Sequence, residues 1–217
     1  MRRLAFAGLI SLAALLGGVA FLLEQVKVPT HAIQSSVTRT SALIERAWQL
    51  PVAGTFGRLV GWQSNPSICG VASLANVFRS LGDGPKTEGE VLRGTNHCWF
   101  GVCIIGLTLD ELAGVAAVHT QRKVTVLRDL TPEAFLTHLR QANDPTRRYI
   151  VNFSRQPIFG AGGGHHSPIG GYLEDEDLVF VLDVNRKFEP WLVERSRLFT
   201  ALDTRDGDAK RGLLLID

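Results

Sequence analysis

Cys69 is the residue best placed in this sequence to act as a nucleophile. It opens an amphipathic run with the spacing of a helix that buries one face, with apolar residues at Val71, Leu74, Ala75, Phe78 and Leu81. Pro66 and Ser67 just upstream are typical of a helix start. The free backbone N–H groups and the dipole of a first turn lower the pKa of a thiol. The alternative is an inert Cys69, since free cysteines usually behave as small buried apolar residues.

The other groups that a thiol nucleophile needs lie in separate segments. It requires a base, a group that holds the base, and donors for the charge that develops on the carbonyl oxygen. The histidines at 165 and 166 are candidate bases, and Asp183 is a candidate orienting group. Gln63, six residues before Cys69, can supply an N–H to the oxygen beside the backbone N–H of Cys69. This order is that of papain-like enzymes, although adjacent histidines are often loop residues and strand-end aspartates often turn residues.

The elements that must position these groups change in kind along the chain. Helices dominate the first half, whereas the segments 165–172 and 178–183, joined through 174–177, predict an antiparallel hairpin. Helices first and antiparallel strands afterwards predict an α+β domain. Further helices are predicted over 41–50, 87–92, 108–118, 131–141 and 194–202, further strands over 124–127, 149–153 and 212–216, an irregular stretch over 51–62 and a loop over 94–106.

Three separated segments carry a resemblance to a known family: Gln63–Leu74, Gly164–Tyr172 and Leu182–Arg186. They read as a cysteine followed by glycine and a small residue, then H-x-S-P-I, then L-D-V-x-R. In kind, order and spacing they closely resemble phytochelatin synthase, the papain-related glutathione γ-glutamylcysteinyltransferase family. The resemblance covers about residues 43–212 and implies a papain-like fold, with the cysteine on the helical half and the histidine and aspartate on the sheet.

The resemblance assigns a role to each candidate residue. Cys69 matches the nucleophile and Asp183 the orienting acid. His165 matches the base because it holds the first position of the histidine motif, eighteen residues before Asp183. His166 holds the variable position and, as the next strand residue, should point to the opposite face. Gln63 matches the oxyanion-hole glutamine. For substrate binding the candidates are Arg155, ten residues before His165, and Gly164.

The implied reaction is a two-step acyl transfer that needs no cofactor. Cys69 attacks the Cys–Gly bond of glutathione, glycine leaves with a proton from His165, and a γ-glutamylcysteinyl thioester remains. Either water takes the acyl group, or a second glutathione takes it, often as a cadmium or zinc thiolate, to give phytochelatin. A chain of this length resembles the short bacterial members, which favour hydrolysis.

The amino terminus predicts a membrane anchor or a signal peptide. Arg2 and Arg3 precede an uncharged apolar run, Leu4–Leu23, which is long enough to span a bilayer as a helix. We therefore expect an anchor or signal over residues 1–24, a polar tether over 25–40 and a catalytic domain over 41–217. The arginines would stay in the cytoplasm, which places the domain in the periplasm or otherwise outside the cytoplasm, attached to the inner membrane.

The composition argues against some classes of function, and the role of two cysteines in the segment 94–106 stays open. A net charge of +2 with scattered lysine and arginine argues against nucleic-acid binding, and three cysteines are too few for a disulfide scaffold. Cys98 and Cys103 fit a soft metal contact with His97, a small disulfide, or two unrelated loop cysteines.

Two other functions compete. C39-type leader peptidases also have a Gln-x5-Cys-Gly helix with a later His and Asp, but their histidine is not followed by Ser-Pro-Ile-Gly-Gly. A catalytically silent periplasmic binding module is disfavoured because every catalytic position holds a competent residue.

Overall fold

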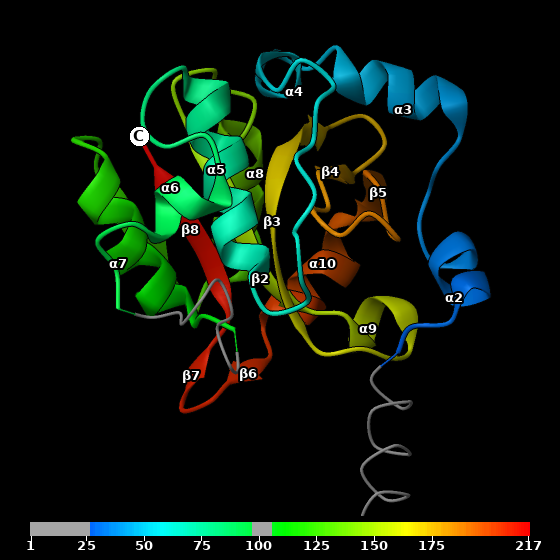
Figure 1. Ribbon diagram of the computed structural model, residues 1–217. Coiled ribbons are helices and arrows are strands. Elements are labelled where there is room, and N and C mark those ends of the chain that lie inside the picture. The colour runs from blue at the N-terminus through cyan, green and yellow to red at the C-terminus, as the bar shows by residue number, and fades with distance from the viewer. Residues whose placement is uncertain (1–26, 97–105) are drawn as a thin grey trace, which may run out of the picture.

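A six-stranded antiparallel sheet forms the centre of the protein in a computed structural model that describes residues 27–96 and 106–217. Its strand order is β1-β8-β2-β3-β4-β5 (Figure 1). The strands are β1 (Val124–Leu127), β2 (Arg148–Ser154), β3 (Gly164–Leu173), β4 (Leu178–Val181), β5 (Trp191–Glu194) and β8 (Gly212–Ile216). The short strands β6 (Arg205–Asp206) and β7 (Ala209–Lys210) form a separate hairpin.

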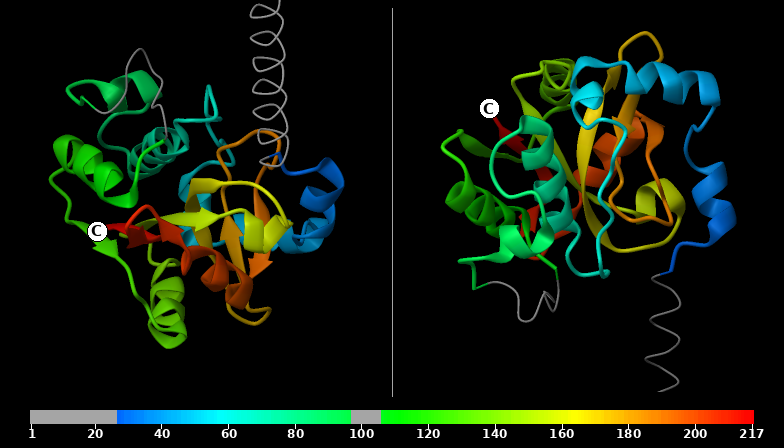
Figure 2. Two further views of the ribbon diagram at one scale, coloured as in Figure 1. Left: turned by 90° about the horizontal axis from the view of Figure 1, so that it is seen from below. Right: turned by 45° about the horizontal axis from the view of Figure 1, so that its top comes forward.

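Helices cover both faces of this sheet (Figures 1 and 2). One group is α3 (Ser41–Trp48), α4 (Pro51–Thr55), α5 (Cys69–Leu81), α6 (Glu88–Leu92) and α7 (Leu109–His119), and the other is α2 (Thr30–Ser35), α8 (Pro132–Gln141), α9 (Gln156–Phe159) and α10 (Arg195–Leu202). Strand alternation divides the apolar side chains between the groups. Along β8, Leu214 packs with the first group and its neighbours Leu213 and Leu215 with the second. The predicted α+β class is confirmed.

Most of the predicted elements are confirmed, because they rest on local signals. Thr87 and Thr108 each accept a hydrogen bond from a backbone N–H three residues on, where a glutamate closes the capping box. The predicted hairpin is β3 and β4, paired in antiparallel register from Ile169 to Leu173. The sequence does not predict α4 or β5. Both are short, and β5 is paired with β4 along its length.

Residues 28–40 belong to the domain, whereas the sequence predicted a tether over 25–40. Val28 and Ile33 are buried among the apolar side chains of α8, α9 and α10. Thr38 exchanges two backbone hydrogen bonds with Leu192 of β5. This packing holds the segment, although its composition is polar. The predicted anchor over 4–23 lies outside the described residues; within 27–96 and 106–217 no helix is long and apolar enough to cross a membrane.

Arg148 is buried at the start of β2 and joins the sheet to the helical half. It is 2% exposed, and it donates to Ser80 Oγ at 2.8 Å and to Thr55 Oγ1 at 2.9 Å. Three backbone carbonyl oxygens accept its remaining hydrogen bonds. Burial lowers its pKa to about 10, so the guanidinium stays charged at neutral pH.

Arg148→Lys is expected to lower the free energy of unfolding by about 2 kcal/mol, because a lysine ammonium cannot reproduce the planar fork and leaves buried acceptors unpaired. Urea unfolding followed by circular dichroism measures the change. Arg147→Lys is the matched control, since the side chain of that neighbour is 30% exposed and its ion pair with Asp144 is 3.7 Å long. It should shift stability by less than about 0.5 kcal/mol. Equal shifts in the two variants would contradict the role of Arg148.

Candidate active site

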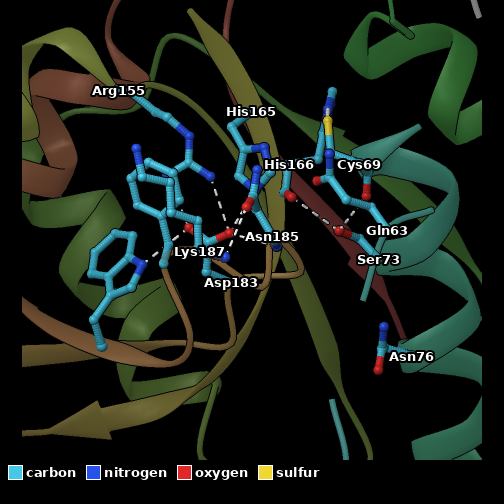
Figure 3. A network of polar contacts seen from close by, with 12 residues as sticks. Gln63, Cys69, Ser73, Asn76, Arg155, His165, His166, Asp183, Asn185 and Lys187 are labelled. Carbon is cyan, nitrogen blue, oxygen red and sulfur yellow. Dashed lines mark hydrogen bonds and ion pairs between the residues drawn. The ribbon is translucent and has the colours of Figure 1, made fainter. Parts of the chain in front are cut away.

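Cys69 is the first residue of α5 and is 7% exposed. The residue before it, Ile68, provides no side-chain cap, so the first-turn N–H groups of a 13-residue helix are not taken by a capping side chain. The predicted position of the thiol at the helix start is therefore confirmed. Its sulfur faces β3, where His165 and His166 lie (Figure 3).

Both histidines act on the sulfur. His165 is bound through Nε2 to Asp183 Oδ1 at 2.9 Å, and its charge and hydrogen bonding lower the pKa of the Cys69 thiol. His166 Nδ1 lies 3.8 Å from Cys69 Sγ, within hydrogen-bonding distance for sulfur. The sequence predicted that His166 would point away from the nucleophile, and this prediction is wrong.

The reason is that one edge of β3 is open beside Cys69. Residues 164–168 of β3 pair with β2, whereas the pairing with β4 begins only at Ile169. The start of α5 lies along this open edge. Ser73 Oγ is 2.7 Å from the carbonyl oxygen of Cys69 and 3.1 Å from that of His166, which fixes helix and strand together. A thiol beside the edge of a strand can be reached by side chains from both of its faces.

Asp183 is fully buried, and each of its oxygens has more than one partner. Oδ1 accepts from His165 Nε2 at 2.9 Å, from Arg155 Nη2 at 3.0 Å and from the backbone N–H of Asn185 at 2.9 Å. Oδ2 accepts from Trp191 Nε1 at 3.1 Å and forms an ion pair with Arg155 Nη1 at 3.0 Å. Burial raises the pKa of Asp183, but the charge of Arg155 and the contacts with His165 outweigh it and hold the pKa well below its usual range. The carboxylate stays ionised.

Arg155 lies behind Asp183 and not in the cavity beside Cys69 (Figure 3). It is 6% exposed, and its guanidinium carbon is 3.4 Å from the ring centroid of Phe188. The sequence predicted a substrate contact for this residue. The geometry supports a different task, which is to hold the Asp183 carboxylate ionised and in place.

The charges of this group favour a thiolate beside an imidazolium. Burial raises the pKa of Cys69, but the charge and hydrogen bond of His165, together with the hydrogen bond of His166, lower that pKa well below the usual thiol value. For His165, burial and Arg155 lower the pKa, whereas Asp183 and Cys69 raise it, and the net direction is upward. Sulfur and imidazole therefore each stabilise the charged form of the other.

Gln63 lies beside Cys69, as predicted, but its amide is occupied in the free protein (Figure 3). Its backbone N–H donates to Val184 O at 2.8 Å, just past Asp183. Its Nε2 donates to Asn65 O at 2.8 Å, and its Oε1 is buried without a hydrogen-bond partner among the described residues. Donation to a substrate oxyanion would require Nε2 to exchange Asn65 O for that oxygen.

A cavity of about 430 Å³ opens at Cys69. Gly164 lines it, which agrees with its predicted place, and a Cβ at this position would overlap the guanidinium of Arg211. The cavity is lined by Pro66, Ser67, Cys69, Gly106, Leu107, Gly164, His166, Asp206 and Arg211.

Arg211 and Asp206 line this cavity and form an ion pair there. The sequence did not predict either residue as part of the site. Arg211 Nη1 donates to Asn152 Oδ1 at 2.7 Å and lies 3.2 Å from Asp206 Oδ2. Its Nε is buried without a hydrogen-bond partner among the described residues. No local signal distinguishes these two residues from scattered surface charges, since they reach the site only through the β6–β7 hairpin.

A second cavity of about 460 Å³ lies between α3 and the chain before Gln63. It is lined by Arg39, Ile44, Trp48, Arg58, Val60, Trp62, Glu189 and Pro190. It contains none of the candidate catalytic groups, whereas the slightly smaller cavity at Cys69 contains Cys69 and His166.

The described part of the chain holds no group of three or more His, Cys, Asp or Glu side chains arranged to bind a metal ion. The candidate contacts His97, Cys98 and Cys103 lie outside the described residues.

Comparison with known proteins finds one matching family model, "Phytochelatin synthase", which covers residues 23–213. The chain is 29% identical to glutathione gamma-glutamylcysteinyltransferase 1 of Triticum aestivum over 91% of its length, and 33% identical to glutathione gamma-glutamylcysteinyltransferase 2 of Arabidopsis thaliana over 71%. It is 24% identical to the Schizosaccharomyces pombe glutathione gamma-glutamylcysteinyltransferase over 71%. The matches cover 43%, 37% and 41% of these relatives, so the chain spans less than half of their length.

Proposed function

The chain belongs to the phytochelatin synthase family, and from that premise we propose that it is a glutathione γ-glutamylcysteinyltransferase or peptidase with a papain-like fold. The observation that carries the proposal is the buried group of Cys69, His165 and Asp183, in which His165 is 2.9 Å from Asp183 and lowers the pKa of Cys69, at the wall of a cavity of about 430 Å³. A thiolate, a proton donor and a fixed orienting carboxylate are what acyl transfer through a thioester requires.

In the first half-reaction the Cys69 thiolate attacks the carbonyl carbon of the Cys–Gly bond. The backbone N–H of Cys69 and the side-chain N–H of Gln63 stabilise the oxyanion, once Gln63 has released Asn65 O. His165 gives its proton to the departing glycine amine, and the γ-glutamylcysteinyl thioester remains. Asp183 keeps the His165 ring oriented throughout, and Arg155 keeps Asp183 ionised.

In the second half-reaction an acceptor replaces glycine. Water gives γ-glutamylcysteine, and the amine of a second glutathione, alone or as a cadmium or zinc thiolate, gives phytochelatin. The metal enters as part of the substrate, and the chemistry proposed here needs no bound cofactor.

The paired charges in the cavity suit the glutamyl end of glutathione. A γ-glutamyl group ends in a carboxylate and an ammonium on one carbon atom. The Arg211 guanidinium and the Asp206 carboxylate, 3.2 Å apart, offer the complementary charges. Because Gly164 has no side chain, the Arg211 guanidinium can lie against it.

Arg211→Met is expected to raise KM for glutathione about 10- to 100-fold, because a hydrogen bond to a charged group contributes about 1.5–3 kcal/mol. Initial rates of glycine release against glutathione concentration measure it. Arg205→Met is the matched control, since its guanidinium is exposed and donates to Asp208 O, outside the cavity. An unchanged KM in Arg211→Met would show that the glutamyl end binds elsewhere.

The activity itself is tested by incubating the purified full-length protein with glutathione, with and without cadmium, followed by mass spectrometry. Glycine with γ-glutamylcysteine means hydrolysis, and longer (γ-Glu-Cys)n-Gly products mean transfer. Unchanged glutathione with a folded protein would refute both.

We further propose that residues 4–23 attach the domain to the outer face of the inner membrane, on the basis of the uncharged run behind Arg2 and Arg3. A reporter fused after Asp217 should be active only outside the cytoplasm. Reporter activity confined to the cytoplasm would overturn this topology.

A further inference from the structure

We infer that His166 is a second catalytic hydrogen-bond donor to Cys69, which stabilises the sulfur as leaving group when the acyl-enzyme breaks down. This inference rests on the acyl-transfer function proposed above. It starts from the 3.8 Å contact between His166 Nδ1 and Cys69 Sγ, a contact that the histidine motif does not require.

The hydrogen-bonding state of His166 fits a neutral donor. The side chain is 3% exposed, and its Nε2 is buried without a hydrogen-bond partner among the described residues. A neutral imidazole carries one proton, so a ring that donates through Nδ1 has a bare lone pair at Nε2. A protonated ring would instead bury an N–H with no acceptor, which is the less favourable state.

The charges around the sulfur support the same state. Cys69 and Asp183 supply two negative charges, and His165 and Arg155 supply two positive charges. This balance leaves no counter-charge for a protonated His166. Arg211 and Asp206 also border the cavity at Cys69, and their charges offset one another.

The backbone of His166 is held from both sides, which limits where its ring can lie. Its residue pairs with Asn152 of β2, and its carbonyl oxygen lies 3.1 Å from Ser73 Oγ on α5. The Cys69 thiolate therefore has two hydrogen-bond donors, His165 and His166, which have different roles. His165 has the Asp183 carboxylate behind it and exchanges protons with the substrates, whereas His166 has no such partner and acts only as a hydrogen-bond donor to the sulfur.

The two half-reactions should depend on this donor to different degrees. In deacylation the acceptor, water or an amine, forms a bond to the thioester carbon. The carbon–sulfur bond breaks with its electron pair going to Sγ, and the acceptor's proton passes to His165. A second donor stabilises the departing sulfur directly. In acylation the same donor makes sulfur a weaker nucleophile while increasing its thiolate fraction, so the two effects partly cancel.

His166→Phe removes the donor, and His166→Asn is the matched control because its side-chain amide can place a donor near the position of Nδ1. The first measurement is the rate of Cys69 alkylation by iodoacetamide against pH, without glutathione. We expect its midpoint to rise by about one pH unit in His166→Phe, a tenfold loss of thiolate at fixed pH, and to return most of the way in His166→Asn.

The second measurement is rapid-quench glycine release from glutathione. His166→Phe should keep a glycine burst while its steady-state rate falls about tenfold, with acyl-enzyme visible by intact mass. His166→Asn should recover the rate.

An unchanged alkylation midpoint in His166→Phe would overturn the inference, and so would a burst that falls together with the steady-state rate. The alkylation profile needs no substrate. If the wild-type protein released no glycine, the acyl-transfer function would fail while the donor role of His166 was still decided.

Discussion

Replacing Cys69 by serine is expected to lower the rate of glycine release from glutathione at least about 10,000-fold. The site is arranged around an anion at this position, because His165 and His166 both lower the pKa of the Cys69 thiol against the effect of burial. A serine hydroxyl is far less acidic, so the same imidazoles cannot keep it ionised. The measurement is glycine release under saturating glutathione, with circular dichroism to verify that the variant is folded.

The pH dependence of the wild-type protein provides the companion test. Because the pKa of Cys69 is lowered, kcat/KM should rise with pH well below the usual range of thiols. Because the pKa of His165 is raised, kcat/KM should fall only above the usual range of histidine, as the proton donor is lost. A folded Cys69→Ser protein that retained glycine release, or a wild-type profile that rose only near the usual thiol pKa, would refute the thiolate mechanism.

The candidate nucleophile, base and orienting acid were predictable from the sequence, because the signals for these residues are local or lie in short motifs. The 3.6-residue periodicity after Cys69 predicts α5 and the thiol at its first turn. The eighteen-residue spacing places Asp183 just past the end of β4, which pairs with the strand of His165, and the structure brings the two side chains to 2.9 Å. Each of these inferences depends on geometry within one element or one hairpin.

What the sequence did not reveal depends on contacts between distant elements. Strand alternation alone predicts that His166 points away from Cys69. In the structure the pairing of β3 with β4 begins only at Ile169, so the edge of β3 beside Cys69 is open and His166 can reach the sulfur. Arg155 was placed in the substrate site by its distance from His165 in the sequence, whereas its partner is Asp183, which follows β4. Arg211 directly follows the β6–β7 hairpin, whose Gly207-Asp208 turn is a hairpin signal but whose two-residue strands are too short to show a strand pattern.

Replacing Asp183 by asparagine should damage both catalysis and stability, because this one carboxylate serves both. We expect kcat/KM to fall about 1,000- to 10,000-fold, since His165 loses the group that fixes its orientation and stabilises its imidazolium. We also expect the free energy of unfolding to fall by about 3–5 kcal/mol, because Arg155, which is 6% exposed, keeps a buried charge without its partner.

The two losses can be separated with a second substitution. In Asp183→Asn/Arg155→Met both charges are gone, and methionine can keep part of the contact with Phe188. This double variant should recover most of the stability of the wild-type protein in urea unfolding, while glycine release stays as low as in Asp183→Asn. Recovery of both would show that Asp183 acts only through folding, and recovery of neither would show that Arg155 is not the charge that Asp183 compensates.

The dependence of the free energy of unfolding on pH at low pH provides an independent check on the pair Asp183 and Arg155. The pKa of Asp183 is lower in the folded protein than in the unfolded chain, so its stabilising effect is complete above about pH 4. That effect should disappear as the pH falls through the folded value. Asp183→Asn removes this titration, so its stability should change less between pH 4 and pH 2 than that of the wild-type protein. Parallel curves for the two proteins would contradict an ionised, Arg155-bound Asp183 as the group that holds His165 beside Cys69.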